Sequence, residues 1–417
     1  MSAAPVLDDR LTAALGTRLD RLARAEQRKL GFPGWSTPLP EELVPFLSYE
    51  LNNYGDPAVD PVFPWHTKDL ERELVDELAD LFGAPPRQCW GYVTAGGSDG
   101  VLAGLWLARQ RLPQARVYHS TAAHPSVRRA AELLRMPAVA VPAQPSGELD
   151  YDELYRRCTA DPELPAAVVA TIGTTLSEAV DQVPRIRAVL REAGVAGRYV
   201  HSDAALAGVP LALTAESRPD FGLGADGSDS LSISGHKFFG TPFPCGVLLS
   251  CTGNRAAAVD DQLICGAPDT MSSSRNGHAT LLLWYQLRRR GLAGLRAQAQ
   301  RSRSVAEYAE QRLSHIGWPA WRSHRYAMTV VLRCPPQAVL NQWHLPRIGG
   351  LSHIVCTPGV THARIDQFVA AVHAAAARKG RPGHVTTDDL QCGGPDLQPI
   401  AAAELHPGGV DGSGPAG

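Results

Sequence analysis

Lys237 follows a short apolar run and is well placed to act as a nucleophile. The sequence LSIS at 231–234 predicts a buried strand, and FFGTP at 238–242 predicts a turn bounded by glycine and proline. Ser234 and His236 flank the turn that holds the amine. A lysine at the end of a buried strand is a candidate for Schiff-base formation with a carbonyl compound.

Asp203 supplies a carboxylate at the end of a second short apolar strand, YVHSDAA at 199–205. Pyridoxal phosphate (PLP) needs both groups. An amine holds its aldehyde, and an acid keeps its pyridine nitrogen protonated so that the ring accepts electrons. The pair Lys237 and Asp203 therefore predicts a PLP site.

A glycine-rich turn supplies the third piece of chemistry. Residues 92–100, YVTAGGSDG, predict a strand that runs through Gly96 and Gly97 into a helix. Backbone N–H groups and partial positive charge at a helix N-terminus attract phosphate. An ordinary helix N-cap made by the Ser98 side chain would explain the same residues without a ligand. The lysine and aspartate downstream favour the phosphate site.

His124 and Thr175 complete the set of candidate residues. His124 lies in AAHPSV at 122–127, after a predicted strand and at the start of a predicted helix. Its imidazole is suited to stack on a flat cofactor ring, and a solvent-facing histidine is the alternative. Thr175 follows the apolar run 167–172, at the end of a strand where parallel sheets bind ligands. Four candidate groups thus follow four strands, which indicates one site.

The elements that would position these residues alternate along the chain. Strands are expected at 116–119, 138–142, 167–173, 199–203, 230–235 and 246–251, with helices at 98–111, 125–135 and 182–194. This alternation predicts an α/β fold with a mostly parallel sheet and helices on both faces. Residues 68–82 predict an amphipathic helix with its leucines toward the core and its charges opposite. Helices at 280–316 and 362–378 with strands at 328–332 and 352–356 predict a smaller α+β domain.

Composition narrows the class of protein. The chain has 417 residues, 44% of them hydrophobic and 20% charged, and a net charge of −2. The near balance of charges predicts no nucleic-acid partner, and no apolar run is long enough for a membrane span or a secretory h-region. We therefore expect a cytoplasmic protein. The eight cysteines form no CxxC pair and no HExxH motif occurs, which favours free thiols and predicts no metal site.

Five segments together resemble a known family. They are GYVTAGGSDG, HPSVRRA, ATIGTT, HSDAALAG and SGHKFFGTPFPCGVLLS, and ELNNYGDP at 50–57 and SSSRNGH at 272–278 extend the similarity. In order and spacing they resemble the PLP-dependent group II amino-acid decarboxylases, most closely bacterial histidine decarboxylases and plant serine decarboxylases. The resemblance covers roughly residues 50–370. It implies fold type I, the aspartate-aminotransferase-like fold, and a homodimer with active sites at the subunit interface.

The resemblance also implies a role for each candidate residue. Lys237 is similar to the lysine that binds PLP, Asp203 to the acid paired with the pyridine nitrogen, and His124 to the histidine stacked on the ring. The phosphate-binding residues correspond to Gly96, Gly97, Ser98, Ser234 and His236. Thr175 corresponds to the threonine beside the ring substituents, and Ala205 to the small residue under the cofactor. His201 either fixes the Asp203 carboxylate or is a plain strand residue.

The implied reaction is decarboxylation of an L-amino acid through an external aldimine and a quinonoid. The family segment E-Y-I-G-x-x-D-T-T-I-S-G-S-R-N is LICGAPDTMSSSRN here, so that Ile264 replaces a tyrosine and Ser273 a glycine. Because isoleucine cannot donate a proton, this departure is either neutral or changes the substrate or the fate of the quinonoid. The alternatives are therefore decarboxylation-dependent oxidative deamination, or β-elimination of a modified amino acid such as an S-conjugated cysteine, as in specialised metabolite biosynthesis. A catalytically silent PLP-fold binding protein is the alternative from another class.

We expect four regions in the chain. Residues 1–60 form an N-terminal dimerisation arm, since the proline-rich stretch 33–45 has no core of its own. The PLP-binding large domain spans 61–265, and a small C-terminal domain spans 266–380. The tail, 381–417, is rich in glycine, proline and alanine and is expected to be disordered.

Overall fold

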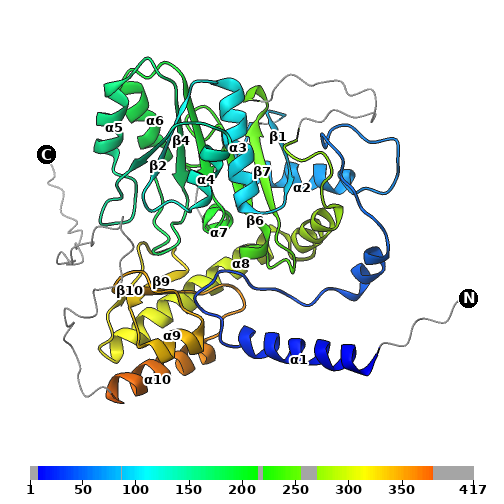
Figure 1. Cartoon of the computed structure of the whole chain (residues 1–417), viewed down its shortest axis with the longest axis vertical. Coiled ribbons are helices and arrows are strands. Elements are labelled where there is room, and N and C mark those ends of the chain that lie inside the picture. The colour runs from blue at the N-terminus through cyan, green and yellow to red at the C-terminus, as the bar shows by residue number, and fades with distance from the viewer. Residues whose placement is uncertain (1–7, 86, 215–218, 255–269, 379–417) are drawn as a thin grey trace, which may run out of the picture.

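Two β-sheets organise the chain (Figure 1). The computed structural model describes residues 8–85, 87–214, 219–254 and 270–378. The larger sheet has seven strands in the order β1-β7-β6-β5-β4-β2-β3. These are β1 (Cys89–Thr94), β2 (Arg116–Ser120), β3 (Ala138–Val141), β4 (Ala166–Thr171), β5 (Arg198–Asp203), β6 (Ser230–Ser234) and β7 (Gly246–Cys251).

The larger sheet is mostly parallel, as the sequence predicts. The pairs β6-β5, β5-β4, β4-β2 and β2-β3 are all parallel. Only β7 runs against its neighbours, β1 and β6. Each of the strands β2 to β7 lies within two residues of the apolar run that predicted it. The reversed direction of β7 was not foreseen, because an apolar run carries no information about strand direction.

Helices cover both faces of this sheet, and the side-chain alternation of the strands explains why. On β4, Ala167 and Val169 share one core cluster with α3 (Gly97–Arg111) and α4 (Ser126–Leu133). The alternate residues, Val168 and Ala170, share the other cluster with α2, α5, α6 and α7. These four helices are α2 (Lys68–Leu81), α5 (Tyr151–Ala160), α6 (Val183–Glu192) and α7 (Gly208–Thr214). Successive strand residues point to opposite faces, so both faces are apolar.

The smaller sheet is antiparallel, in the order β10-β9-β8. It comprises β8 (Ala320–Trp321), β9 (Thr329–Arg333) and β10 (Leu351–Val355), and α9 (Gln337–Trp343) and α10 (His362–Arg378) pack in the same core. The long helix α8 (Gly277–His315) contributes to the cores of both sheets and bends at Gly291. The limits expected near residues 265 and 380 and the tail lie outside the described residues, and the limit near 60 stays a prediction.

The N-terminal segment contains α1 (Asp9–Glu26) and a 3₁₀ helix (Glu41–Ser48). No residue of α1 is buried. In α2 one expectation was wrong, because Lys68 and Glu71 are buried beside the leucines instead of facing water. Among the described helices, none is long and apolar enough to cross a bilayer.

Candidate active site

The candidate residues lie at the carboxyl ends of neighbouring strands. Asp203 ends β5 and pairs in register with Thr171 at the end of β4 and with Ser232 on β6. Two residues further along β6, Ser234 leads into a π-helical turn, Gly235–Phe239, which carries Lys237. Because these strands are parallel, their carboxyl ends meet at one edge of the sheet, where α/β proteins bind ligands.

Asp203 and Ser234 also share one face of the sheet. Residues 199, 201 and 203 of β5 point to the same side, and Tyr199 packs in the cluster that contains α3. On β6, Ser232 lies against Gly100 of α3, which places the side chain of Ser234 on that side as well. The candidate site therefore lies on the face covered by α3 and α4.

Lys237, Asp203 and His124 come close enough to influence one another's charge. Burial lowers the pKa of Lys237, and the nearby Asp203 carboxylate opposes this shift. Burial raises the pKa of Asp203, and Lys237, the Ala205 N–H group and His124 oppose that shift. The Ala205 N–H group donates to Oδ1 of Asp203 at 3.3 Å. The three residues therefore form one group of interacting charges.

His124 is held by the first turn of α4. The backbone N–H group of Ser126 donates to Nδ1 of His124 at 3.2 Å, and Oγ of Ser126 lies 2.8 Å from the same nitrogen. Burial lowers the pKa of His124, with Lys237 adding to the shift and Asp203 opposing it. With Nδ1 accepting a hydrogen bond, the neutral ring carries its proton on Nε2. His124 is exposed, and the charges of Lys237 and Asp203 both act on its pKa, so its stacking on the cofactor ring stays a prediction.

The glycine-rich turn begins α3 without a side-chain cap. Gly96 is the N-cap residue, and its φ of 156° and ψ of 178° suit only glycine. The alternative in which Ser98 caps the helix is wrong, because Ser98 lies inside the first turn. The Asp99 carboxylate accepts from the N–H group of Ala95 at 2.9 Å. An uncapped helix start of this kind presents N–H groups to an anion.

Close packing joins this turn to the end of β6. A Cβ atom at Gly97 would lie 2.6 Å from Oγ of Ser234 and 3.1 Å from Cβ of Ala205. Gly97, Ser234 and Ala205 come from three separate segments and lie so close together that a side chain at position 97 would collide with its neighbours. His236 lies just beyond, with Nδ1 3.3 Å from the carbonyl oxygen of Cys245.

Thr175 lies on the exposed turn after β4. The preceding Thr174 is buried instead, and its Oγ1 accepts from the N–H group of Ala179 at 3.0 Å. No contact in the structure joins Thr175 directly to Lys237 or Asp203, so its role remains a prediction.

His201 does not hold the Asp203 carboxylate. Its Nδ1 lies 2.8 Å from Oγ of Ser230, and its Nε2 lies 3.2 Å from Oγ of Ser232. Both ring nitrogens are thus engaged with serines of β6. The possibility that this ring binds Asp203 directly is wrong, and His201 is a fully buried residue of β5 that packs against Gly104 of α3.

Acidification is expected to destabilise the protein through His201. Burial lowers its pKa to about 3, so the unfolded chain takes up this proton at a higher pH than the folded chain does. The stability that depends on the neutral ring is present above about pH 6.5 and is lost as the pH falls toward 3. Urea unfolding across this range should show a shallower decline in His201→Gln, by about one proton, than in wild type. His373→Gln, at an exposed helical position, should keep the wild-type slope.

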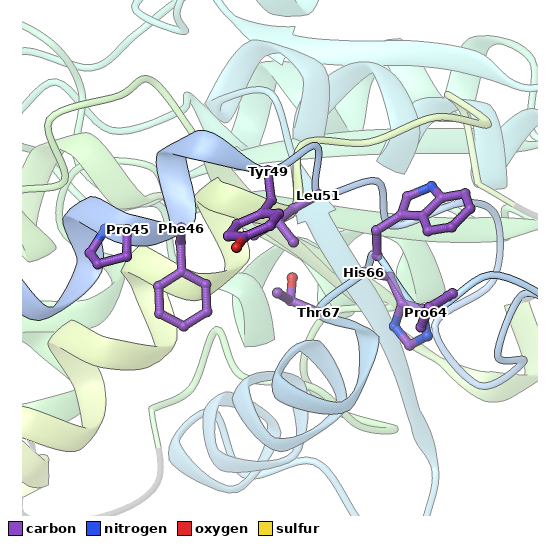
Figure 2. Close-up of a pocket in the computed structure, with 8 residues that line it drawn as sticks. Pro45, Phe46, Tyr49, Leu51, Pro64, His66 and Thr67 are labelled. Atoms are coloured by element: carbon purple, nitrogen blue, oxygen red, sulfur yellow. The ribbon is translucent and has the colours of Figure 1, made fainter. Parts of the chain in front are cut away.

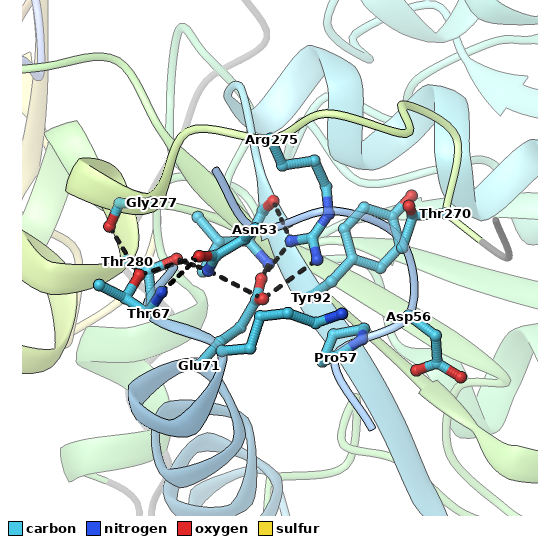
Figure 3. A network of polar contacts seen from close by, with 12 residues as sticks. Asn53, Asp56, Pro57, Thr67, Glu71, Tyr92, Thr270, Arg275, Gly277 and Thr280 are labelled. Carbon is cyan, nitrogen blue, oxygen red and sulfur yellow. Dashed lines mark hydrogen bonds and ion pairs between the residues drawn. The ribbon is translucent and has the colours of Figure 1, made fainter. Parts of the chain in front are cut away.

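A buried polar network lies beside the glycine-rich turn, and sequence reasoning missed it (Figure 3). Glu71 of α2 pairs with Arg275, and both side chains are almost fully buried. The Glu71 carboxylate also accepts from the backbone N–H group of Val93 at 2.7 Å and from Nδ2 of Asn53 at 3.1 Å. The sequence did indicate that Glu71 is buried, because this residue lies three positions before Leu74 on the apolar face of α2.

The network joins the two outlying motif segments to β1. Arg275, from SSSRNGH, donates through Nη2 to the carbonyl oxygen of Gly55, from ELNNYGDP, at 2.7 Å. The N–H group of Gly55 donates in turn to the carbonyl oxygen of Ser273 at 2.8 Å. Ser273 is exposed and lies where the backbones meet, whereas Ile264 lies outside the described residues. The network therefore fixes two loops against the strand that leads to the glycine-rich turn.

Known proteins resemble this chain in sequence. Residues 61–317 match the model of the pyridoxal-dependent decarboxylase conserved domain. The histidine decarboxylase of Mesorhizobium japonicum is 38% identical over 360 residues, which cover 85% of this chain and 96% of that protein. The chain belongs to the group II PLP-dependent decarboxylases. The histidine decarboxylase of Pseudomonas entomophila is a further relative of this decarboxylase, 34% identical over 86% of the chain and 92% of that protein.

Solved structures give the same fold for this decarboxylase. The L-methionine decarboxylase from Streptomyces sp. 590 superposes with a TM-score of 0.80 at 22% identity, covering 92% of this chain and 98% of that one. A glutamate decarboxylase from Lactobacillus brevis superposes with a TM-score of 0.71 at 18% identity, covering 92% and 96%. The expected fold type I architecture is confirmed.

Family membership confirms the cofactor and the class of reaction. The chain is an enzyme that uses PLP to decarboxylate an amino acid, and the alternative of a catalytically silent protein is not supported. The residues present fit this cofactor, because a half-buried lysine and a buried carboxylate lie together near an uncapped helix start.

Proposed function

We propose that the site around Lys237 decarboxylates an L-amino acid, with L-histidine as the first candidate substrate. The observation that carries this proposal is the convergence of Lys237, Asp203 and His124 at one edge of the sheet. Relatives named histidine decarboxylase, 33–38% identical over most of the chain, support histidine as the candidate.

Each residue has a distinct task in this proposal. When bound, PLP supplies an aldehyde for the substrate amine and a ring that takes up the electrons released with carbon dioxide. Lys237 provides the amine that holds the cofactor, and its lowered pKa enlarges the neutral, nucleophilic fraction. Asp203 keeps a proton at the pyridine nitrogen, and a cation there would stabilise the buried carboxylate.

The remaining candidates bind and orient. His124 presents the face of its ring, with the proton on Nε2 set by Ser126. Gly96, Gly97 and Ser98 provide backbone N–H groups for the phosphate, helped by Ser234 and His236. Thr175 and Ala205 border the cofactor ring. A substrate carboxylate held near His124 would be shielded from water on that side.

A product analysis tests this function. Incubation with a panel of L-amino acids should release carbon dioxide and the matching amine, with histamine from L-histidine as the leading expectation. Assays under air and under argon should give the same amine yield. Aldehyde with ammonia and peroxide, formed only under air, would instead support oxidative deamination and would connect Ile264 to that outcome. Release of a thiol from an S-conjugated cysteine would support β-elimination, and both alternatives fit specialised metabolite biosynthesis.

We also propose a homodimer, supported by exposed apolar side chains in the N-terminal segment. Leu11, Leu15, Leu19 and Leu22 lie along one side of α1, and all are exposed. A cavity of about 420 Å³ lies between the 3₁₀ helix and the segment just before α2 (Figure 2). Its lining includes Tyr49 and Trp65, which are 69% and 50% exposed. Exposed apolar side chains gathered in this way mark interaction sites.

Light scattering is expected to give about twice the chain mass of 44.6 kDa. Leu19→Glu together with Leu22→Glu should weaken the dimer, because the charges would be buried at the contact. Arg21→Gln on the same helix serves as the control and should leave the mass unchanged. A wild-type enzyme that is monomeric and fully active at low concentration would contradict the proposal.

A further inference from the structure

Glu178 connects the segment after β4 of the larger sheet to β9 of the smaller sheet. It lies in the segment after β4 that also contains Thr175, and its side chain is buried. Its Oε2 accepts three hydrogen bonds from the start of β9. The donors are the N–H groups of Met328 at 3.1 Å and Thr329 at 2.8 Å, and Oγ1 of Thr329 at 2.6 Å.

Two more hydrogen bonds join the same segments. Oγ of Ser323 donates to the carbonyl oxygen of Ser177 at 2.6 Å, and Nε2 of His324 lies 3.0 Å from the carbonyl oxygen of Glu178. The segment before β9 is therefore attached to residues 177–178 by main-chain and side-chain contacts. No other described carboxylate makes three hydrogen bonds to the start of β9.

Hydrogen bonds within the turn link Glu178 to Thr174, the residue next to Thr175. The N–H group of Glu178 donates to the carbonyl oxygen of Thr174 at 2.8 Å. The N–H group of Thr174 donates to the carbonyl oxygen of Ala179 at 2.9 Å, and the N–H group of Ala179 donates to Oγ1 of Thr174 at 3.0 Å. A shift of Glu178 would therefore move Thr174 and the adjoining Thr175.

Glu178 has this position at an energetic cost. Its φ of 60° is left-handed, a conformation that favours glycine over residues with a Cβ. Its second carboxylate oxygen, Oε1, is buried without a hydrogen-bond partner among the described residues. Glycine would avoid both costs, so the benefit of glutamate lies in its contacts with β9.

We propose that Glu178 is a positioning residue that fastens the Thr175 turn to β9 and thereby holds this side of the PLP site in place. The inference rests on the proposed role of Thr175 beside the cofactor. Glu178 acts through Thr175 and the turn, and does not touch the reacting atoms.

Burial favours the neutral form of Glu178, whereas its hydrogen-bond donors favour the charged form. Burial raises its pKa to about 7, while the donors on Thr329 and Met328 and the nearby Arg322 oppose the shift. Cys356 and His324 also face it. Glutamine keeps an acceptor for the three donors and is neutral at every pH, so Glu178→Gln is the conservative variant.

Glu178→Gly separates the two contributions, because it relieves the backbone and removes the contacts with β9. Titration of the apoprotein with PLP should show about a tenfold loss of affinity in Glu178→Gly, within the range of coupling energies between protein sites. Glu178→Gln should remain within about threefold of wild type, and Thr329→Val, which removes one donor, should fall between them. Arg135→Gly relieves a similar φ of 54° at an exposed position and should leave the affinity unchanged.

Hydrogen exchange of the apoproteins gives a readout that is independent of activity. Protection at residues 174–179 and 326–329 should fall together in Glu178→Gly while the strands β5 and β6 keep theirs. Unchanged PLP affinity in Glu178→Gly would overturn the inference, even if its melting temperature fell. If borohydride reduction shows PLP on Lys237 of the wild type, unchanged affinity in Glu178→Gly would overturn the positioning role alone. A wild type that does not bind PLP at Lys237 would overturn the proposed function as well.

Discussion

Lys237→Ala is expected to lower the turnover of an accepted amino acid by about 10² to 10⁴-fold or more. This is the range for removal of a positioned proton-transfer group, and Lys237 also holds the cofactor covalently in the proposed function. Borohydride reduction of the wild type should attach PLP to the peptide that contains Lys237. The variant should bind PLP reversibly and lose the covalent product, as mass spectrometry of the digest would show.

The lysines of the chain make this test sharp, because there are only four, at positions 29, 68, 237 and 379. Lys68 is the informative control, since burial also lowers its pKa, to about 8. Its amine is engaged by the carbonyl oxygens of Tyr54 and Val59, whereas Lys237 lies beside Asp203. Label on Lys68 or Lys29 would contradict the assignment, as would a Lys237→Ala variant that folds and turns over at the wild-type rate.

Local patterns predicted the elements that carry the site because its residues follow apolar strands. The run at 199–203 corresponds to β5, and the polar residue at its end, Asp203, lies at the carboxyl edge as expected. The same reasoning placed Lys237 in a turn after β6. Strand periodicity and end position are local properties, and one sequence is enough to read them. The π-helical form of the turn is not a local property and was not predicted.

Properties that depend on distant partners were missed. The pattern of α2 assigned all its charges to water, yet Glu71 is buried because Arg275, 204 residues along the chain, pairs with it. Glu178 likewise resembles a surface residue until β9 supplies its donors. Ser98 was weighed as a cap from its type alone, although Gly96 occupies that position. Polarity predicts exposure only when no partner is present in the fold.

Breaking the Glu71–Arg275 pair is expected to cost about 3–5 kcal/mol of unfolding free energy, because either single substitution leaves a buried charge without its partner. Arg275→Met would leave the Glu71 carboxylate with the donors from Val93 and Asn53 alone. Glu71→Gln would leave the guanidinium facing carbonyl oxygens. Urea denaturation of the two single variants and the double variant gives a mutant cycle, in which the double variant should lose less than the sum.

An exposed ion pair between α2 and α8, the helix that begins just after Arg275, gives the matched control. Glu73 and Arg288 are 50% and 47% exposed, so water and salt screen their attraction and Glu73→Gln should hardly move the unfolding midpoint. The buried pair should also affect the site, since Val93 leads directly into the turn at Gly96 and Gly97. PLP affinity should therefore fall in the single variants even where the protein remains folded. Additive effects in the cycle with unaltered PLP affinity would show that the network neither couples these segments nor supports the glycine-rich turn.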